Sequence, residues 1–177
     1  MRPPGNIRLF IALWPTDEVR DAIARWQAAW AWPEKAAVVK AERLHVTLHF
    51  LGDVAPARVV DLKYVLGRVV SPGFTLEFGH PEVWQHGVAV LRPDNSPTAL
   101  RALHGRVGLA LASIGLAAED RTYRPHVTLA RRAGGAKPPG QAARIAWESD
   151  GSFALVQTLR GGRGYEVLER FGEQAAR

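Results

Sequence analysis

The pattern of hydrophobic and polar residues changes period several times along the chain. Residues 6–14, NIRLFIALW, are apolar and partly alternating, and Pro15 follows them, which predicts a buried strand that ends at a turn. From Thr16 the period becomes helical, because acidic residues fill the first turn after this candidate N-cap and an apolar stripe follows at Val19, Ile23, Trp26 and Trp30. The chain therefore opens with a strand and an amphipathic helix.

The same periodicity and capping criteria predict the later elements, among which strands become more frequent toward the C-terminus. The pattern predicts a strand at 43–52 closed by Gly52, a helix at 55–70, strands at 74–79 and 87–93, a helix capped by Ser96 and reaching about Leu116, a strand around 126–129, and a hairpin of 153–160 and 165–171. The basic, Gly/Pro-rich stretch 131–142 is typical of a mobile loop. This order favours an α+β fold with mainly antiparallel sheets over a doubly wound parallel sheet.

One tetrapeptide, His-Val-Thr-Leu, occurs twice, at 45–48 and at 126–129. The second copy begins 81 residues after the first (45 to 126), which is close to half of the 177 residues. Each copy follows a predicted helix and precedes a turn that contains glycine. We therefore expect a single domain, 1–177, built from two related lobes that contribute one motif strand each.

Alternation along a strand gives each motif two chemically different faces. His45 and Thr47 share one face while Leu44, Val46 and Leu48 share the other, and the second copy repeats this with His126 and Thr128. Imidazole has an ordinary pKa of about 6.5, so near neutral pH one ring can accept a proton while another donates one. Such a pair suits cleavage of a phosphodiester, and threonine hydroxyls can bind the non-bridging phosphate oxygens.

Composition narrows the classes of function. The chain has no cysteine, which excludes disulfides, thiolate metal sites and a cysteine nucleophile. It contains no apolar run of about 18 residues and no signal-peptide pattern, so we expect a soluble, cytoplasmic protein without membrane contact. A net charge of +6, carried mostly by arginine, favours a polyanionic partner with phosphate groups.

Alternative interpretations of the histidines remain open. A single strand histidine is more often a surface residue than a catalytic one, and a chance duplication of a strand-like tetrapeptide is possible. His45 and His49 have a metal-binding spacing, but on a strand four residues span about 13 Å, which is too far for one ion. We therefore predict no metal, place His49 at the edge of the site or on the surface, and treat His80, His86 and His104 as structural or exposed.

These residues resemble the two motifs of the two-histidine (2H) phosphoesterases, specifically the RNA 2',3'-cyclic phosphodiesterases also called 2'-5' RNA ligases. The resemblance covers nearly the whole chain, since RLFIALWPTDEVR is similar to the opening strand and helix of the family, LHVTLHFLG and RPHVTLAR to its motifs, and YEVLERF to its closing strand. The chain departs from many relatives in ending with FGEQAAR instead of a proline-leucine sequence. The family implies a bilobal, pseudo-symmetric α+β fold of two mainly antiparallel sheets, flanked by helices, with the active site in the groove between the lobes.

The resemblance also implies roles and a reaction. His45 would donate a proton to the leaving oxygen, His126 would activate water, and Thr47, Thr128 and Arg131 would bind phosphate. Strict alternation sets Arg131 opposite His126, so it reaches the site only if the strand has ended or bulged before it. The expected substrate is RNA or a nucleotide with a terminal 2',3'-cyclic phosphate, opened to a 2'-phosphate without cofactor, metal or obligate protein partner. RNA ligation in the reverse direction and a non-catalytic RNA-binding module are the alternatives.

Overall fold

The computed structural model describes residues 5–116 and 122–172, and the five C-terminal residues of FGEQAAR lie outside this part. The described ranges contain, in order, β1 (Ile7–Leu13), α1 (Asp17–Ala28), β2 (Ala37–Val38), β3 (Val46–Val54), α2 (Val59–Leu66), β4 (Phe74–Trp84), β5 (Val88–Pro93), α3 (Thr98–Ser113), β6 (Val127–Arg131), β7 (Ile145–Ser149), β8 (Phe153–Thr158) and β9 (Tyr165–Phe171). Four short 3-10 turns connect them, at Ala41–Arg43, Pro56–Arg58, Gln85–Gly87 and Arg160–Gly162. None of the helices in these ranges has the length and hydropathy of a membrane-spanning segment.

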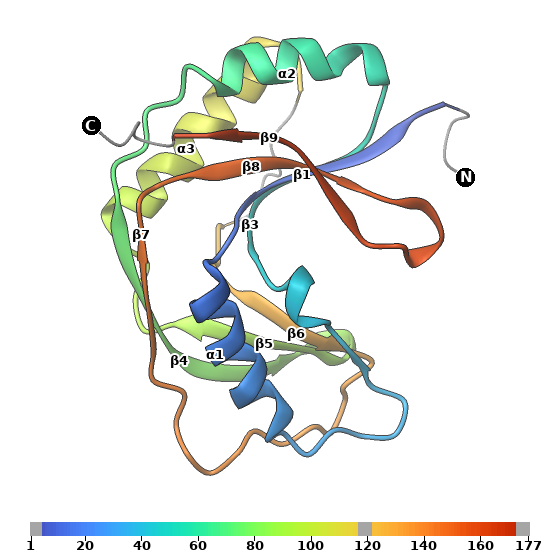
Figure 1. Ribbon diagram of the computed structural model, residues 1–177, viewed down its shortest axis with the longest axis vertical. Coiled ribbons are helices and arrows are strands. Elements are labelled where there is room, and N and C mark those ends of the chain that lie inside the picture. The colour runs from blue at the N-terminus through green and yellow to red at the C-terminus, as the bar shows by residue number, and fades with distance from the viewer. Residues whose placement is uncertain (1–4, 117–121, 173–177) are drawn as a thin grey trace.

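The strands form one curled antiparallel sheet with two halves (Figure 1). The order is β7-β4-β5-β6-β3-β1-β8-β9, and β2 adds a short pairing to β6. The halves are joined between β3 and β6, where the ladder consists of the single pair Val46–Val127. The predicted α+β fold is confirmed, and the two expected sheets prove to be continuous through this one pair.

The helices cover the two halves separately. In Figure 1, α2 and α3 lie together beyond β1, β3, β8 and β9, whereas α1 lies across the half that contains β4, β5 and β6. Helix α1 begins as predicted, because the backbone N–H of Val19 donates to Oγ1 of Thr16 at 3.4 Å. The predicted cap of α3 is wrong, since Pro97 occupies the N-cap position and no side chain of a described residue caps this helix.

Several element boundaries differ from the predicted ones. β3 begins only at Val46 and runs through Gly52, which has a φ of 70°, to Val54, because β1 continues to pair with it beyond a register shift. The helix expected at 55–70 is α2, which starts after a 3-10 turn and ends at Leu66. β7 was not predicted, and it forms only as an edge strand along β4.

The stretch 131–142 forms no long strand, but backbone hydrogen bonds fix its path. Ala31 and Lys137 exchange N–H···O bonds of 3.0 and 3.2 Å, and the N–H of Ala133 donates to the carbonyl of Gly87 at 2.8 Å. Ala133 and Ala136 are buried in the main core. The predicted mobile loop is therefore attached to the half of the sheet that contains β6.

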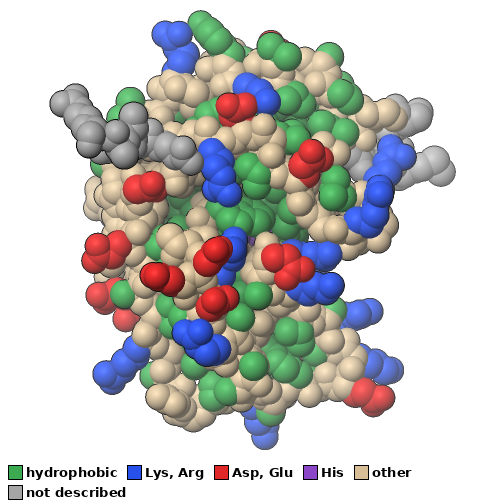
Figure 2. Space-filling model, viewed as in Figure 1, with side chains coloured by type: hydrophobic (Ala, Val, Ile, Leu, Met, Phe, Trp, Pro, Cys, Tyr) green, Lys and Arg blue, Asp and Glu red, His purple; other side chains and the backbone are tan. Residues whose placement is uncertain are grey.

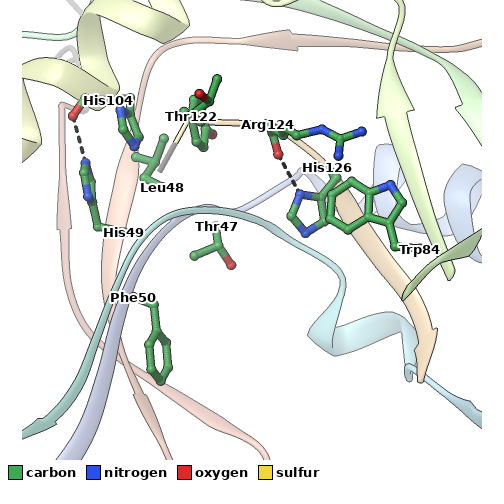
Figure 3. Close-up of a pocket in the computed structure, with 10 residues that line it drawn as sticks. Thr47, Leu48, His49, Phe50, Trp84, His104, Thr122, Arg124 and His126 are labelled. Carbon is green, nitrogen blue, oxygen red and sulfur yellow. Dashed lines mark hydrogen bonds between the residues drawn. The ribbon is translucent and has the colours of Figure 1, made fainter. Parts of the chain in front are cut away.

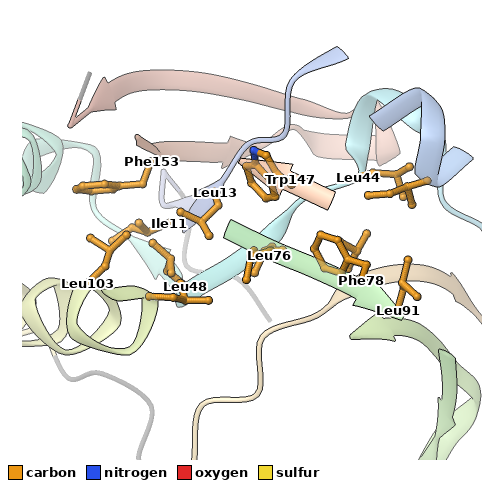
Figure 4. Packing of buried hydrophobic residues seen from close by; sticks show 14 of the residues in the cluster. Ile11, Leu13, Leu44, Leu48, Leu76, Phe78, Leu91, Leu103, Trp147 and Phe153 are labelled. Atoms are coloured by element: carbon orange, nitrogen blue, oxygen red, sulfur yellow. The ribbon is translucent and has the colours of Figure 1, made fainter. Parts of the chain in front are cut away.

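The main core lies behind the motif strands and draws side chains from both halves of the sheet (Figure 4). Leu44, Val46 and Leu48 are at most 3% exposed, and Val127 and Leu129 are fully buried. Truncation of such a leucine to alanine typically costs about 2–5 kcal/mol. The core therefore fixes the apolar face of both motifs and leaves His45, Thr47, His126 and Thr128 on the opposite, partly exposed face.

Candidate active site

The pairing of β3 with β6 brings the two motifs together. In an antiparallel pair the residues on either side of Val46–Val127 are also opposite each other, which sets Thr47 beside His126 and His45 beside Thr128. Each histidine immediately precedes its strand, at the one position where the two halves of the sheet are joined. Two segments 81 residues apart in sequence (45 to 126) therefore present both imidazoles and both hydroxyls to one place.

The ring of His45 is held in a defined tautomer. Its Nδ1 lies 2.6 Å from the backbone carbonyl of Arg43, and because a carbonyl only accepts, Nδ1 carries the proton. Its Nε2 lies 3.1 Å from Oγ1 of Thr47. The ring stacks on Phe10 at 4.9 Å and on Trp14 at 5.4 Å, and Tyr165 meets its edge at 5.4 Å. In a neutral His45, Nε2 is therefore the proton acceptor.

The surroundings of His45 favour its neutral form. Burial lowers the pKa of His45 to about 4, the Arg43 carbonyl partly opposes this shift, and the nearby positive charges of His126 and Arg131 add to it. The apolar floor below the ring is a small cluster of Phe10, Ala12, Ala154 and Val156, with Trp14 and Tyr165 packed against it. In the free site His45 is neutral at pH 7.

His126 has the corresponding arrangement in the other half. Its Nδ1 lies 2.7 Å from the carbonyl of Arg124, so this nitrogen is again the donor and Nε2 is the nitrogen that can exchange a proton with a substrate (Figure 3). The indole of Trp84 meets the ring at 4.5 Å. Trp84 is held in turn by a hydrogen bond from its Nε1 to Glu82.

Glu82 also organises the cations around Trp84. Its carboxylate accepts from Arg92 and lies 3.3 Å from Nη2 of Arg124, whose guanidinium stacks over Trp84 at 4.6 Å. Burial opposes the ionised form, but the hydrogen bonds from Trp84 and Arg92 and the charges of Arg92 and Arg124 hold the pKa of Glu82 below its usual value. The carboxylate thus stays ionised and fixes this wall of the site.

The repeat is longer than the tetrapeptide recognised in the sequence. Both copies read Arg-x-His-Val-Thr-Leu, as RLHVTL at 43–48 and RPHVTL at 124–129. Each arginine supplies the carbonyl that orients the histidine two residues later, and each guanidinium lies over an aromatic ring, Tyr165 for Arg43 and Trp84 for Arg124. Sequence reasoning missed both arginines, although the longer repeat was present to signal them.

Two pockets flank the paired motifs, one at each histidine. The His126 pocket, about 360 Å³, is lined by Thr47, Leu48, His49, Phe50, Trp84, His104, Thr122, Tyr123, Arg124 and His126 (Figure 3). The His45 pocket, about 320 Å³, is lined by Arg8, Phe10, Val39, Arg43, His45, Thr47, Phe50, Thr128, Arg131, Thr158 and Tyr165. Thr47 and Phe50 belong to both, so the two pockets are adjacent. Among the described residues, the lining of the His45 pocket includes three arginines and no acidic residue.

Arg131 reaches the His45 pocket because β6 bulges. Ala130 pairs with Ala89 and Thr128 pairs with Val90, so Leu129 is an extra residue without a partner on β5. Leu129 and Ala130 are both buried, and the alternation resumes with Arg131 exposed on the same side as Thr128. The sequence alone allowed Arg131 to reach the site only if the strand ended or bulged before this residue, and the bulge at Leu129 meets that condition. Arg132, by contrast, lines a separate pocket with His86 and Gly87.

The structure decides between the two alternatives for His49, because this residue lies at the edge of the site and lines the His126 pocket. His49 is not a surface residue but is 3% exposed, with Nε2 2.8 Å from the carbonyl of His104. The rings of His49, His104 and Tyr123 form a stack with spacings of 4.1 and 4.0 Å that lines the His126 pocket. In the part of the chain that the structure describes, no group of three or more His, Asp or Glu side chains could hold a metal ion.

Residues 15–155 match the family model of the 2'-5' RNA ligase superfamily, a span that includes both histidine motifs. The chain belongs to this superfamily. The sequence resemblance to the 2H phosphoesterases is therefore confirmed.

Named relatives and solved structures agree with this membership. The RNA 2',3'-cyclic phosphodiesterase of Escherichia coli K12 is 35% identical over 137 residues, which cover 75% of this chain and 78% of that protein. The RNA 2',3'-cyclic phosphodiesterase of Thermus thermophilus is 30% identical over 184 residues, which cover 93% and 89%. Among solved structures, E. coli LigT in its apo form superposes with a TM-score of 0.82 at 32% identity, over 94% of this chain and 97% of that one.

Proposed function

We propose that this member of the 2'-5' RNA ligase superfamily hydrolyses the terminal 2',3'-cyclic phosphate of RNA or of a nucleotide to a 2'-phosphate, without a metal ion. The observation that carries the proposal is the pair of carbonyl-oriented imidazoles on either side of the β3–β6 junction. The relatives named RNA 2',3'-cyclic phosphodiesterase support the same reaction.

The proposed reaction is a single in-line displacement. Nε2 of His126 accepts a proton from water as the water oxygen bonds to phosphorus, and the bond from phosphorus to O3' breaks on the opposite side. Nε2 of His45 gives its proton to O3', which becomes the free 3'-hydroxyl. The phosphate remains on O2', so one water is consumed and each histidine ends in the charge state opposite to its starting one.

His45 must be protonated to act as this acid, yet its pKa in the free site is about 4. The positive charges of His126 and Arg131 contribute to this low pKa. A bound phosphate anion counteracts them, because it attracts the imidazolium of His45 and offsets the charge of Arg131. Substrate binding is therefore expected to raise the pKa of His45 and load the acid. The rate should follow a bell-shaped dependence on pH, since one imidazole is charged and the other neutral.

Thr47, Thr128 and Arg131 are proposed to bind the non-bridging phosphate oxygens. All three line the His45 pocket, and Oγ1 of Thr47 lies 3.1 Å from Nε2 of His45. Hydroxyl and guanidinium donors at these positions would stabilise the charge that grows on the oxygens in the transition state. We further propose that residues 1–177 act as one domain that needs no protein partner, because the proposed groups all come from one chain. A sequence without cysteine supports the further proposal that the protein works in the reducing cytoplasm.

The test is hydrolysis of a 2',3'-cyclic mononucleotide in excess chelator. Wild-type protein is expected to form the 2'-phosphate, and His45→Ala and His126→Ala are expected to lose at least 10²-fold in kcat, the usual contribution of a positioned acid or base. Both variants should remain folded, as judged by circular dichroism and a cooperative unfolding transition. Activity that requires added metal, or wild-type rates in either variant, would refute the proposal, and RNA binding without turnover would favour a non-catalytic module.

The His126 pocket supports RNA ligation as a second candidate. Water needs no pocket of about 360 Å³, but the 5'-terminal nucleoside of a second RNA would need one on the side where His126 deprotonates the nucleophile. Trp84 and the guanidinium of Arg124 offer flat surfaces for a base there. In the same assay, an added oligonucleotide with a free 5'-hydroxyl should then yield a 2'-5'-linked product beside the hydrolysis product.

A further inference from the structure

The turn between β8 and β9 carries the sequence RGGRG at 160–164 and lies beside the His45 pocket. The proposed roles of the histidines determine where an RNA chain must run. In an in-line displacement the leaving O3' lies on the His45 side, and the ribose that carries O3' also carries the 5'-directed chain. The nucleoside therefore occupies the His45 pocket, and the rest of the RNA leaves past the rim of that pocket.

The turn is joined to this rim by a short series of contacts. The ring of Tyr165, the first residue of β9, lies 5.4 Å from the His45 ring, and the Arg43 guanidinium lies 6.0 Å from Tyr165. Nη2 of Arg43 donates to the carbonyl of Gly162 at 2.7 Å. The turn is thus separated from His45 by two side chains, and Figure 1 shows it curving from β8 and β9 toward the half that contains β6.

The geometry of the turn presents two arginines to solvent. Gly161, Gly162 and Gly164 have positive φ values of 68°, 68° and 116°, and the N–H of Leu159 closes the turn on the carbonyl of Gly164 at 2.9 Å. Arg160 and Arg163 are exposed, and Nε of Arg163 donates to the carbonyl of Arg160 at 3.1 Å. Among the described residues neither guanidinium takes part in an ion pair with an acidic side chain.

The charge of the turn continues that of the pocket. Arg8, Arg43 and Arg131 line the His45 pocket, which has no Asp or Glu among the described residues of its lining, and no acidic residue occurs in the sequence 159–165. Figure 2 shows the outline of the molecule indented on its right edge, with Lys and Arg side chains at the indentation. A row of arginines that leads away from the phosphate site matches the repeating charge of a single RNA strand better than an isolated phosphate.

We propose that the RGGRG turn is a binding site for the RNA backbone, in which Arg160 and Arg163 contact phosphates on the 5' side of the cyclic end. The proposal rests on the proposed function and extends it, because it makes an oligonucleotide the preferred substrate over a cyclic mononucleotide. It also assigns strand binding to this turn instead of the basic stretch 131–142, whose Arg132 lines a different pocket and whose Lys137 is paired through its backbone with Ala31.

The test compares two variants that each lose two positive charges. Arg160→Ala/Arg163→Ala should raise KM roughly fivefold for a pentanucleotide ending in a 2',3'-cyclic phosphate, leave kcat unchanged, and leave both constants unchanged for a cyclic mononucleotide. The dependence of log(kcat/KM) on log salt should become shallower by about 0.7 for each lost contact with a single strand. Arg132→Ala/Lys137→Ala, the matched control, should behave as wild type.

Equal effects of the two variants would mean that only net charge matters, and an unchanged KM for the pentanucleotide would mean that the turn is solvated; either result overturns the proposal. Binding of a labelled pentanucleotide with a 2'-phosphate end, followed by fluorescence anisotropy, tests the turn independently of catalysis. If wild-type protein binds this probe through the turn but hydrolyses neither substrate, the proposed function fails and the binding site stands.

Discussion

At the scale of single residues, the site depends on side chains that set the charge of His45. Burial is the largest cause of its low pKa, and the positive charges of His126 and Arg131 act in the same direction. From the sequence alone, His45 is expected to have the ordinary imidazole pKa of about 6.5. The aromatic residues that bury its ring, Phe10, Trp14 and Tyr165, come together only when β1 and β9 pair on either side of β8.

Arg131→Gln is therefore expected to raise the pKa of His45 in the free protein, because it removes a positive charge that disfavours the imidazolium. The pKa should stay below 6.5, since burial remains. An NMR titration of the His45 ring measures this shift directly, without substrate. Arg132→Gln removes the same charge one residue later, from a side chain that lines another pocket, and should leave the titration unchanged; identical titrations of all three proteins would contradict the expectation.

At the scale of elements, the decisive feature is the bulge in β6 and the helix that supports it. Gln27 on α1 is buried, and its Nε2 donates to the carbonyls of Leu129 at 2.8 Å and Val39 at 3.0 Å. Leu129 is the extra residue of the bulge in β6. The Gln27 side chain of α1 therefore supports the bulge that directs Arg131 into the His45 pocket. The helical period predicted α1, but it could not reveal which strand Gln27 would contact 102 residues away.

Gln27→Leu should lower the free energy of unfolding by about 1–3 kcal/mol, because it leaves buried carbonyl groups with fewer donors. It should also raise KM, since the bulge that positions Arg131 loses its support. Urea unfolding and steady-state kinetics measure the two effects. Gln141→Leu, at an exposed glutamine of the stretch 131–142, is the control, and equal unfolding midpoints for the two variants would show that the bulge does not depend on Gln27.

At the scale of the whole molecule, two histidines link folding to pH. Burial lowers the pKa of both His45 and His104 to about 4, and the charge of His49 contributes at His104. In the unfolded chain these two histidines bind a proton near pH 6.5, whereas in the folded protein they stay neutral until the pH falls to about 4. The stabilisation is thus complete above about pH 6.5 and is lost as pH falls toward 4.

The free energy of unfolding should accordingly fall by on the order of 1 kcal/mol per pH unit for His45 between about pH 6.5 and 4, and less steeply for the partly exposed His104, where solvent screens the charge. His104→Phe keeps a flat ring between His49 and Tyr123 and preserves the backbone carbonyl that His49 contacts. Its stability should therefore vary less steeply with pH than that of wild type. Denaturant unfolding at several pH values compares the two, and parallel curves would exclude His104 as a source of the acid sensitivity.

The amino-acid sequence by itself determined the order of the three helices and of all strands except β2 and β7, the two faces of each motif strand, and the pairing of His45 with His126 as candidate catalytic groups. These features follow from local rules. Side chains alternate between the two faces of a strand, so Leu44, Val46 and Leu48 lie on one face and His45 and Thr47 on the other, whichever strands become neighbours. The doubled motif then made one shared site the simplest expectation, and in the structure the β3–β6 pair places the two motif strands side by side.

Only the tertiary structure decided how these parts act together. The single pair Val46–Val127 joins the halves, the bulge at Leu129 turns Arg131 toward His45, and the stacked rings place His49 and His104 inside the molecule. Each of these is a contact between residues distant in sequence, and neither periodicity nor spacing encodes which strands become neighbours or where a ladder gains a residue. The lowered pKa of His45 has the same origin, because burial is a property of the folded surroundings and not of the imidazole.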